Sequence, residues 1–158
     1  MIKINVASSK YNCNMVINQK ITIIRGKSGK GKSKFTEAAG DVSGVYKISL
    51  SDTNYELVVP PNKDWYKTIS RNIEHKDRCI YVIDDADYVF SAEFYRLFNT
   101  DRYSFYIIIN RFTNFNIKSL GGLPFCIDEV YTFIADGKNH YLESYYKFAD
   151  ENYTTNIE

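Results

Sequence analysis

Residues 26–33 have the sequence GKSGKGKS, which matches the spacing G-x-x-x-x-G-K-S. Glycines allow a loop to turn its backbone N–H groups inward around phosphate oxygens. A helix that begins after the second glycine adds the positive end of its dipole. In such a loop Lys32 would reach the outer phosphates of a nucleotide and Ser33 would hold a magnesium ion. The pattern predicts a phosphate-binding site made by Gly26, Lys27, Ser28, Gly29, Lys30, Gly31, Lys32, Ser33 and Lys34.

More cations surround this loop than one phosphate site needs; the surplus comprises Lys20, Arg25, Lys27, Lys30 and Lys34. One interpretation is solvated charge that raises the local potential for an anionic ligand. The other is a basic mouth that also contacts a nucleic-acid backbone or an acidic partner. Because the net charge of the chain is only +1, nucleic-acid binding would depend on this local patch alone.

Two carboxylates end the apolar run CIYVIDD at residues 79–85. In phosphate-loop proteins an acid at the end of such a strand lies beside the loop and holds magnesium, usually through water. Asp84 is therefore the predicted magnesium residue. Asp85 is a candidate base or water-orienting group, with Asp87 as a reserve. The alternative role for Asp85 is a structural cap for the turn that follows.

A second polar strand end occurs in YIIINR, residues 106–111. If this strand lies next to the strand that leads into the loop, Asn110 or Arg111 would lie near the outermost phosphate. An arginine there can stabilise the charge that develops on the transferred phosphoryl group. The alternative is an ordinary surface arginine. The predicted catalytic set is thus Lys32, Asp85 and Arg111.

The elements that must position these residues alternate between strands and helices. Apolar runs predict strands, and helical spacing of apolar residues predicts helices. Strands are expected at 2–6, 14–18, 20–26, 44–51, 55–59, 79–85 and 103–111, and helices at 31–40, 63–76 and 91–99. Two further strands are expected around a DGKN turn within 128–148. Residues 127–134 could instead begin as a helix.

Strands that are apolar throughout, alternating with helices, indicate a mostly parallel sheet covered on both faces. The length of 158 residues fits one domain spanning 1–158. Its core would cover about 20–111, with strand additions at the N-terminus and a strand-rich extension at 112–150.

The segments GKSGKGKS, YVIDDAD and IIINR resemble the Walker A, Walker B and sensor elements of P-loop NTPases. They are most similar to the AAA-type and STAND-type division, which has an additional strand before the Walker B strand. Small stand-alone ATPases of phages and mobile elements are also similar. The resemblance implies a three-layer α/β/α core, ATP as the nucleotide and Mg²⁺ as the cofactor. No NKxD guanine motif is present, and SLGG at 119–122 follows the Walker B strand, unlike an ABC signature.

The resemblance implies an ATPase that hydrolyses ATP to ADP and phosphate to drive or time a conformational change. A binding module that recruits a partner in one nucleotide state, with little turnover, is the alternative. A small-molecule kinase is the third hypothesis. A protein partner or a second copy of the chain could supply an arginine, and the candidates are Arg71, Arg78, Arg96 and Arg102.

The remaining composition points to a reduced cytoplasmic protein. The three cysteines are widely spaced and follow no pairing motif, and both histidines are isolated, so neither disulfides nor a zinc site are expected. No stretch approaches the roughly 18 apolar residues that a membrane helix needs, and the N-terminus lacks the apolar run of a signal peptide.

Overall fold

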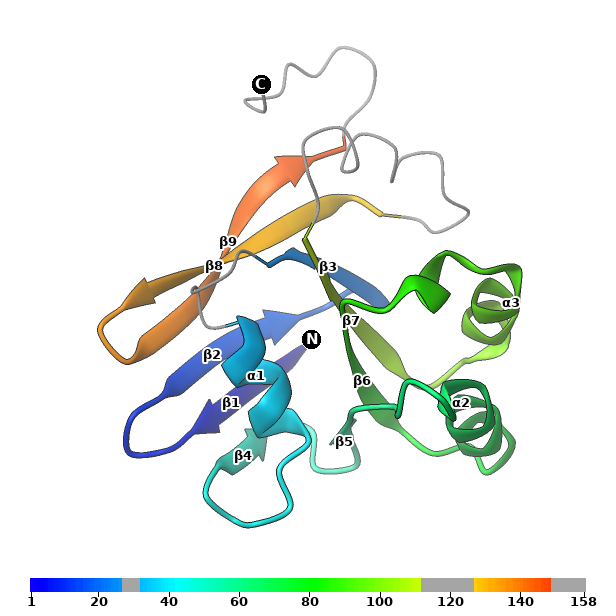
Figure 1. Ribbon diagram of the computed structural model, residues 1–158, viewed down its shortest axis with the longest axis horizontal. Coiled ribbons are helices and arrows are strands. Elements are labelled where there is room, and N and C mark those ends of the chain that lie inside the picture. Colours follow the sequence, from blue (N-terminus) through cyan, green and yellow to red (C-terminus); the bar gives the residue numbers. More distant parts are fainter. Residues whose placement is uncertain (27–31, 112–126, 149–158) are drawn as a thin grey trace.

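The computed structural model describes residues 1–26, 32–111 and 127–148. The strands in this part form one sheet with the order β4-β1-β2-β9-β8-β3-β7-β6-β5 (Figure 1). Their bounds are β1 Ile2–Ala7, β2 Asn12–Ile17, β3 Ile21–Arg25, β4 Lys47–Leu50, β5 Glu56–Val58, β6 Cys79–Asp84, β7 Phe105–Asn110, β8 Glu129–Asp136 and β9 Asn139–Lys147. The helices are α1 Lys32–Ala39, α2 Trp65–Glu74 and α3 Ala92–Thr100, with a short 3₁₀ helix, η1, at Asp87–Phe90.

One half of the sheet is parallel and is centred on β3. Strand β3 pairs with β7 on one side and with β8 on the other, and β6 and β5 continue the parallel set beyond β7. The central strands are apolar along their length because both of their faces are buried. The predicted place of β7, directly beside the strand that leads into the loop, is confirmed.

The other half contains two antiparallel hairpins. Strands β1 and β2 pair with Ile4 opposite Met15, and β4 adds to the free edge of β1. Strands β8 and β9 form the predicted hairpin, whose turn places Gly137 at a positive φ of 60°. Segment 127–134 therefore contributes to a strand rather than a helix. A short parallel pairing of β2 with β9 joins the two hairpins.

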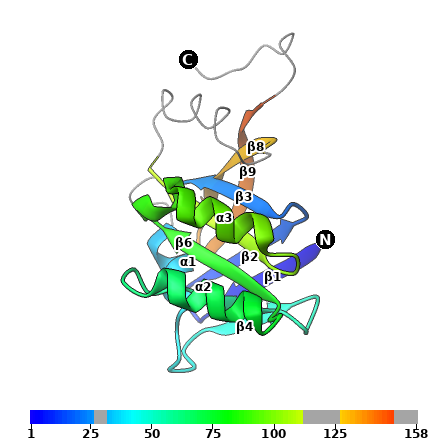
Figure 2. The same ribbon diagram turned by 90° about the vertical axis from the view of Figure 1, so that its right-hand side faces the viewer.

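The predicted three-layer α/β/α core is wrong. The protein is mostly β, with 42% strand and 23% helix, and its mixed sheet curls into a nearly closed, barrel-like form. Helices α2 and α3 lie side by side on the outer face of the parallel strands (Figure 2), where Ile69 and Phe94 pack against Tyr81 and Tyr106. On the opposite face the described residues contribute one helix, α1, and the sheet itself folds over the rest.

The cover on that opposite face comes from the N-terminal hairpin. Residues Ile4 and Met15 are buried in one cluster with Ile80 and Ile107 of the parallel half. Alternation along β1 and β2 leaves one apolar face to bury, and curling of the sheet buries it against β6 and β7 without a second pair of helices. Among the described helices only α1 joins this cluster.

Two further expectations can be compared with the described residues. Cys13 and Cys79 are free and buried, and burial raises the pKa of each thiol to about 11. Cys126 lies outside the described residues. None of the described helices is long and apolar enough to cross a membrane.

We expect Phe35→Ala to lower the free energy of unfolding by about 3–5 kcal/mol, because the Phe35 side chain of α1 is fully buried between the two halves of the sheet. The neighbouring exposed Lys34 gives a matched control, and Lys34→Ala should change stability by less than about 0.5 kcal/mol. Urea unfolding followed by circular dichroism measures both values. Equal losses for the two variants would contradict this placement of α1.

Candidate functional site

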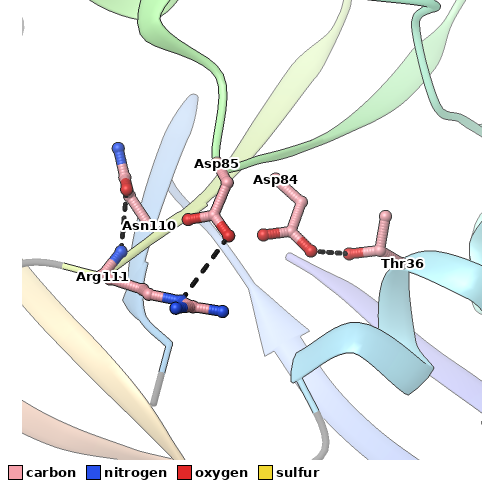
Figure 3. A network of polar contacts seen from close by, with 5 residues as sticks. All are labelled: Thr36, Asp84, Asp85, Asn110 and Arg111. Atoms are coloured by element: carbon pink, nitrogen blue, oxygen red, sulfur yellow. Dashed lines mark hydrogen bonds and ion pairs between the residues drawn. The ribbon is translucent and has the colours of Figure 1, made fainter. Parts of the chain in front are cut away.

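The C-terminal ends of β3, β6 and β7 meet at one edge of the sheet, next to the start of α1 (Figure 3). Strand β3 ends at Arg25, Gly26 follows, and α1 begins at Lys32. The strand and the helix predicted around the glycine-rich pattern are therefore present. Residues 27–31 lie outside the described part of the chain, as do the side chains of Lys32 and Ser33, so their predicted contacts stay predictions.

A hydrogen bond joins α1 to the acidic end of β6. The Thr36 hydroxyl donates to Asp84 Oδ2 over 2.9 Å (Figure 3). Thr36 lies one helical turn after Ser33, and residues three apart share a face of a helix. The bond therefore holds the Asp84 carboxylate beside the face of α1 that carries Ser33. Thr36 has no place in the sequence pattern, and its spacing from Ser33 is the one signal that could have identified it.

Asp85 adopts a backbone conformation that is unusual for a residue with a side chain. Its φ is 51°, in the left-handed region, which costs roughly 1–2 kcal/mol for residues other than glycine. Its N–H still donates to the carbonyl of Ile109 on β7 over 2.9 Å. The strand pairing is thus kept while the side chain turns toward the end of β7. There Asp85 Oδ2 lies 3.8 Å from Nε of Arg111.

The pair of Asp85 and Arg111 is open to solvent, with 41% and 64% of the respective side chains exposed. Both side chains point into the space in front of the β6 and β7 ends, close to Asp84 (Figure 3). The structure therefore brings together two of the predicted catalytic residues, Asp85 and Arg111, which directly follow β6 and β7. An ion pair this exposed contributes little to the free energy of unfolding. Its relevance to the candidate site is that it holds Asp85 and Arg111 next to each other.

Asn110 anchors this edge through its backbone and its side chain. Its carbonyl accepts the N–H of Gly26 over 2.8 Å, which ties the first glycine of the loop to β7. Its side-chain Oδ1 accepts the N–H of Arg111, also over 2.8 Å. Of the two residues that were alternatives for the sensor role, Asn110 thus braces the backbone and Arg111 points toward the carboxylates.

A cleft of about 420 Å³ adjoins the carboxylates on the β5 side of the site. It is lined by Thr36, Val59, Pro60, Pro61, Asn62, Val82, Ile83, Asp84, Asp85 and Tyr88. The Tyr88 ring stacks on Trp65, with ring centroids 4.3 Å apart and planes 3° from parallel. Burial raises the pKa of Tyr88 above its usual range, so its hydroxyl stays protonated. No sequence motif indicated this cleft.

Two of the surplus cations have structural partners. Lys20 lies before β3, at the end away from the loop, where its ammonium group donates to the carbonyl of Phe98 and lies over the Phe98 ring. Arg25 packs over the ring of Tyr145, 4.7 Å from its centroid. Lys34 is exposed on α1. Lys20 therefore lies away from the predicted basic mouth, whereas Arg25 stays beside Gly26 with its side chain against Tyr145.

No protein-family model, curated protein or solved structure matches the chain. The chemistry of the site is therefore inferred from the residues of this chain and their geometry.

The Thr36–Asp84 bond can be measured with a double-mutant cycle. Thr36→Val keeps the shape of the side chain and removes the donor, and Asp84→Ala removes the acceptor. We expect the two changes to be non-additive in the free energy of unfolding by about 1 kcal/mol or more, since a hydrogen bond to a carboxylate is lost only once. A parallel cycle of Thr36→Val with Asp87→Ala, which alters an exposed carboxylate of η1, should be additive. Additivity in both cycles would show that the bond contributes nothing.

Proposed function

We propose that this protein binds ATP with magnesium at the edge formed by β3, α1, β6 and β7, and hydrolyses it to ADP and phosphate. The observation that carries the proposal is the Thr36–Asp84 hydrogen bond. It links the helix that follows the glycine-rich pattern to the acidic strand end, across 48 positions of sequence. A phosphate loop and a magnesium carboxylate must be neighbours to act on one nucleotide.

The donors near α1 suit magnesium. Mg²⁺ prefers oxygen ligands and is usually held by one or two carboxylates or hydroxyls together with phosphate oxygens and water. Asp84 and Ser33 are the residues that would hold it. A bound magnesium ion supplies charge neutralisation at the phosphates.

The remaining roles follow from position. Lys32 begins α1 and would contact the outer phosphates. Asp85 would orient the attacking water, and Arg111, 3.8 Å from it, would stabilise the charge on the transferred phosphoryl group. Hydrolysis would drive or time a conformational change. ATP is favoured over GTP because the sequence lacks the guanine-binding motif.

Each alternative function has one observation in its favour. A nucleotide-dependent binding module with little turnover is favoured by the ion pair, because the two side chains that would act on water and on the phosphoryl group contact each other. A phosphotransferase is favoured by the cleft beside Asp84 and Asp85, whose volume of about 420 Å³ could admit a small acceptor and not only water.

The first prediction concerns Lys32. The wild-type protein should release phosphate from ATP in the presence of magnesium, and Lys32→Ala should abolish the release, because the outer phosphates lose their cation. Lys10→Ala changes an exposed lysine in the β1–β2 turn and serves as the control with unchanged activity.

Phosphate and ADP should be quantified in the same reaction. Equal amounts support hydrolysis, and ADP in excess of phosphate would indicate transfer to an acceptor instead. Binding of ATP without turnover would favour the binding module. Absence of any nucleotide binding would contradict the proposal as a whole.

The second prediction separates chemistry from binding. Asp85→Asn and Arg111→Ala should each lower turnover by about 100-fold or more, because one removes the water-orienting carboxylate and the other the stabilising cation. ATP affinity, measured by calorimetry, should change far less. Asp136→Asn, at the exposed last residue of β8, is the charge-matched control for Asp85→Asn. Unchanged turnover in Asp85→Asn would remove Asp85 from the catalytic set.

A further inference from the structure

The two free edges of the described sheet lie on either side of one short turn. Strands β4 and β5 stand at opposite ends of the strand order, and residues 51–55 join them in the chain (Figure 1). Backbone pairing connects β4 to β1 and β5 to β6. Among the described residues no backbone hydrogen bond crosses from β4 to β5. The curled sheet therefore stays open between these two strands.

A cleft of about 620 Å³ lies in this opening. It is lined by residues 39–42 at the end of α1 and directly after it, by Ile48 and Leu50 of β4, and by Thr53 and residues 55–59 in and around β5. The volume lies within the roughly 300–1,000 Å³ of clefts that hold ligands. The cleft thus has one free strand edge on each side.

Ile48 belongs to the core side of the sheet and is nevertheless exposed. It pairs with Val6 in antiparallel register, and side chains that lie directly opposite each other share a face. Val6 is fully buried, whereas Ile48 is 36% exposed. On the other side of the cleft, Leu57 pairs with the fully buried Ile80 and is itself only partly buried. Both edge strands therefore present inward-facing apolar side chains that the described residues cover only in part.

The charged residues that line the cleft are both acidic. Asp41 follows α1, and its carboxylate accepts the hydroxyl of Ser43 over 2.7 Å, which fixes its position. Glu56 is exposed on β5 and pairs with Cys79, which belongs to the core cluster on the opposite face from Ile48. Lys47 of β4 is not among the lining residues. A strand in the cleft would therefore meet apolar side chains on its inner face and carboxylates beside it.

We propose that an extended segment of a partner protein, in which apolar residues alternate with lysine or arginine, adds to the free edge of β4 in this cleft. A free edge offers backbone donors and acceptors that such a segment can pair with. Its apolar side chains pack against Ile48 and Leu57, and its basic side chains complement Asp41 and Glu56.

The shape of the cleft favours a single extended chain as its occupant. Strand β4 has four residues, so a segment of similar length covers its edge. Because β5 and the end of α1 bound the cleft as well, it suits one added strand better than the edge of a second folded copy. The inference does not depend on the nucleotide chemistry.

The probe for the first experiment is the synthetic peptide KVKVKVK with a fluorescent label, titrated with the full chain and followed by fluorescence anisotropy. Saturable binding is expected. The peptide EVEVEVE reverses the charge, and KVKPKVK lacks one backbone N–H and cannot pair along its length. Both control peptides should bind at least about tenfold more weakly.

Two matched pairs of variants locate the binding site. Ile48→Ser and Ile134→Ser each change a strand isoleucine, 36% and 40% exposed, and Ile134 lies outside the cleft. Glu56→Lys and Glu143→Lys each reverse an exposed strand carboxylate, and Glu143 lies outside the cleft as well. The first variant of each pair should weaken binding of KVKVKVK by about tenfold, and the second should leave it near the wild-type value.

Amide hydrogen exchange tests the mode of binding. The peptide should slow exchange of those amides of 47–50 that are not bonded to β1 by about tenfold or more, since they gain a partner. Exchange in β2 should not change, and the amides of β3 and β7 report that each variant is folded.

Four outcomes would overturn the inference. KVKVKVK does not bind saturably, or the two variants of a matched pair weaken its binding equally. The amides of 47–50 exchange slowly without peptide at every protein concentration, which would show that the chain itself covers this edge. They exchange slowly without peptide only at high protein concentration, which would identify a second copy as the occupant.

Discussion

The candidate site depends on a helix that cannot be stable by itself. Helix α1 has eight residues, fewer than the roughly 12–15 that an isolated helix needs in water. Burial of Phe35, Ala38 and Ala39 between the N-terminal hairpin and the parallel strands holds it in place. Helix α1 also carries Thr36, which donates a hydrogen bond to Asp84. The apolar packing of α1 therefore also sets where Asp84 lies relative to the glycine-rich pattern.

The closure of the sheet links segments that are far apart in the sequence. Strand β3 belongs to the parallel half and pairs with β8 of the C-terminal hairpin, and its last residue, Arg25, contacts that hairpin directly before Gly26. Thr132 on β8 donates to the carbonyl of Arg25 over 3.3 Å, and the Arg25 side chain lies on the ring of Tyr145. A displacement of the β8–β9 hairpin would therefore act on Arg25, the residue directly before Gly26, without a separate domain.

Local patterns predicted the elements well, because each depends on neighbouring residues. The strands, the helices and the hairpin around the DGKN turn are confirmed. Ser91 caps α3 and accepts the N–H of Phe94 over 3.1 Å. Asp64 occupies the N-cap position of α2 without a side-chain bond to the helix. The predicted layers were wrong because periodicity shows which face of a strand is apolar and not what covers it. The hairpin β1–β2 took the place of the expected helices.

In the candidate site too, local features were predictable from the sequence and three-dimensional contacts were not. The strand ends that hold Asp84, Asp85 and Arg111 followed from where apolar runs stop, and the order of β3, β7 and β6 brings them together. The left-handed backbone of Asp85 could not be predicted, since it depends on the bond between its N–H and β7. The Thr36–Asp84 bond was also not predictable, because it needs the three-dimensional distance between two segments.

The stacked pair of Trp65 and Tyr88 has a practical consequence. The chain contains a single tryptophan, and its ring lies on a residue that lines the cleft beside Asp84 and Asp85. The fluorescence emission of an indole depends on the rings and dipoles around it. Any rearrangement at the end of β6 that moves Tyr88 therefore alters the tryptophan fluorescence, which comes from Trp65 alone. The protein thus carries a built-in optical reporter of its own cleft, which can follow events there in real time without a label.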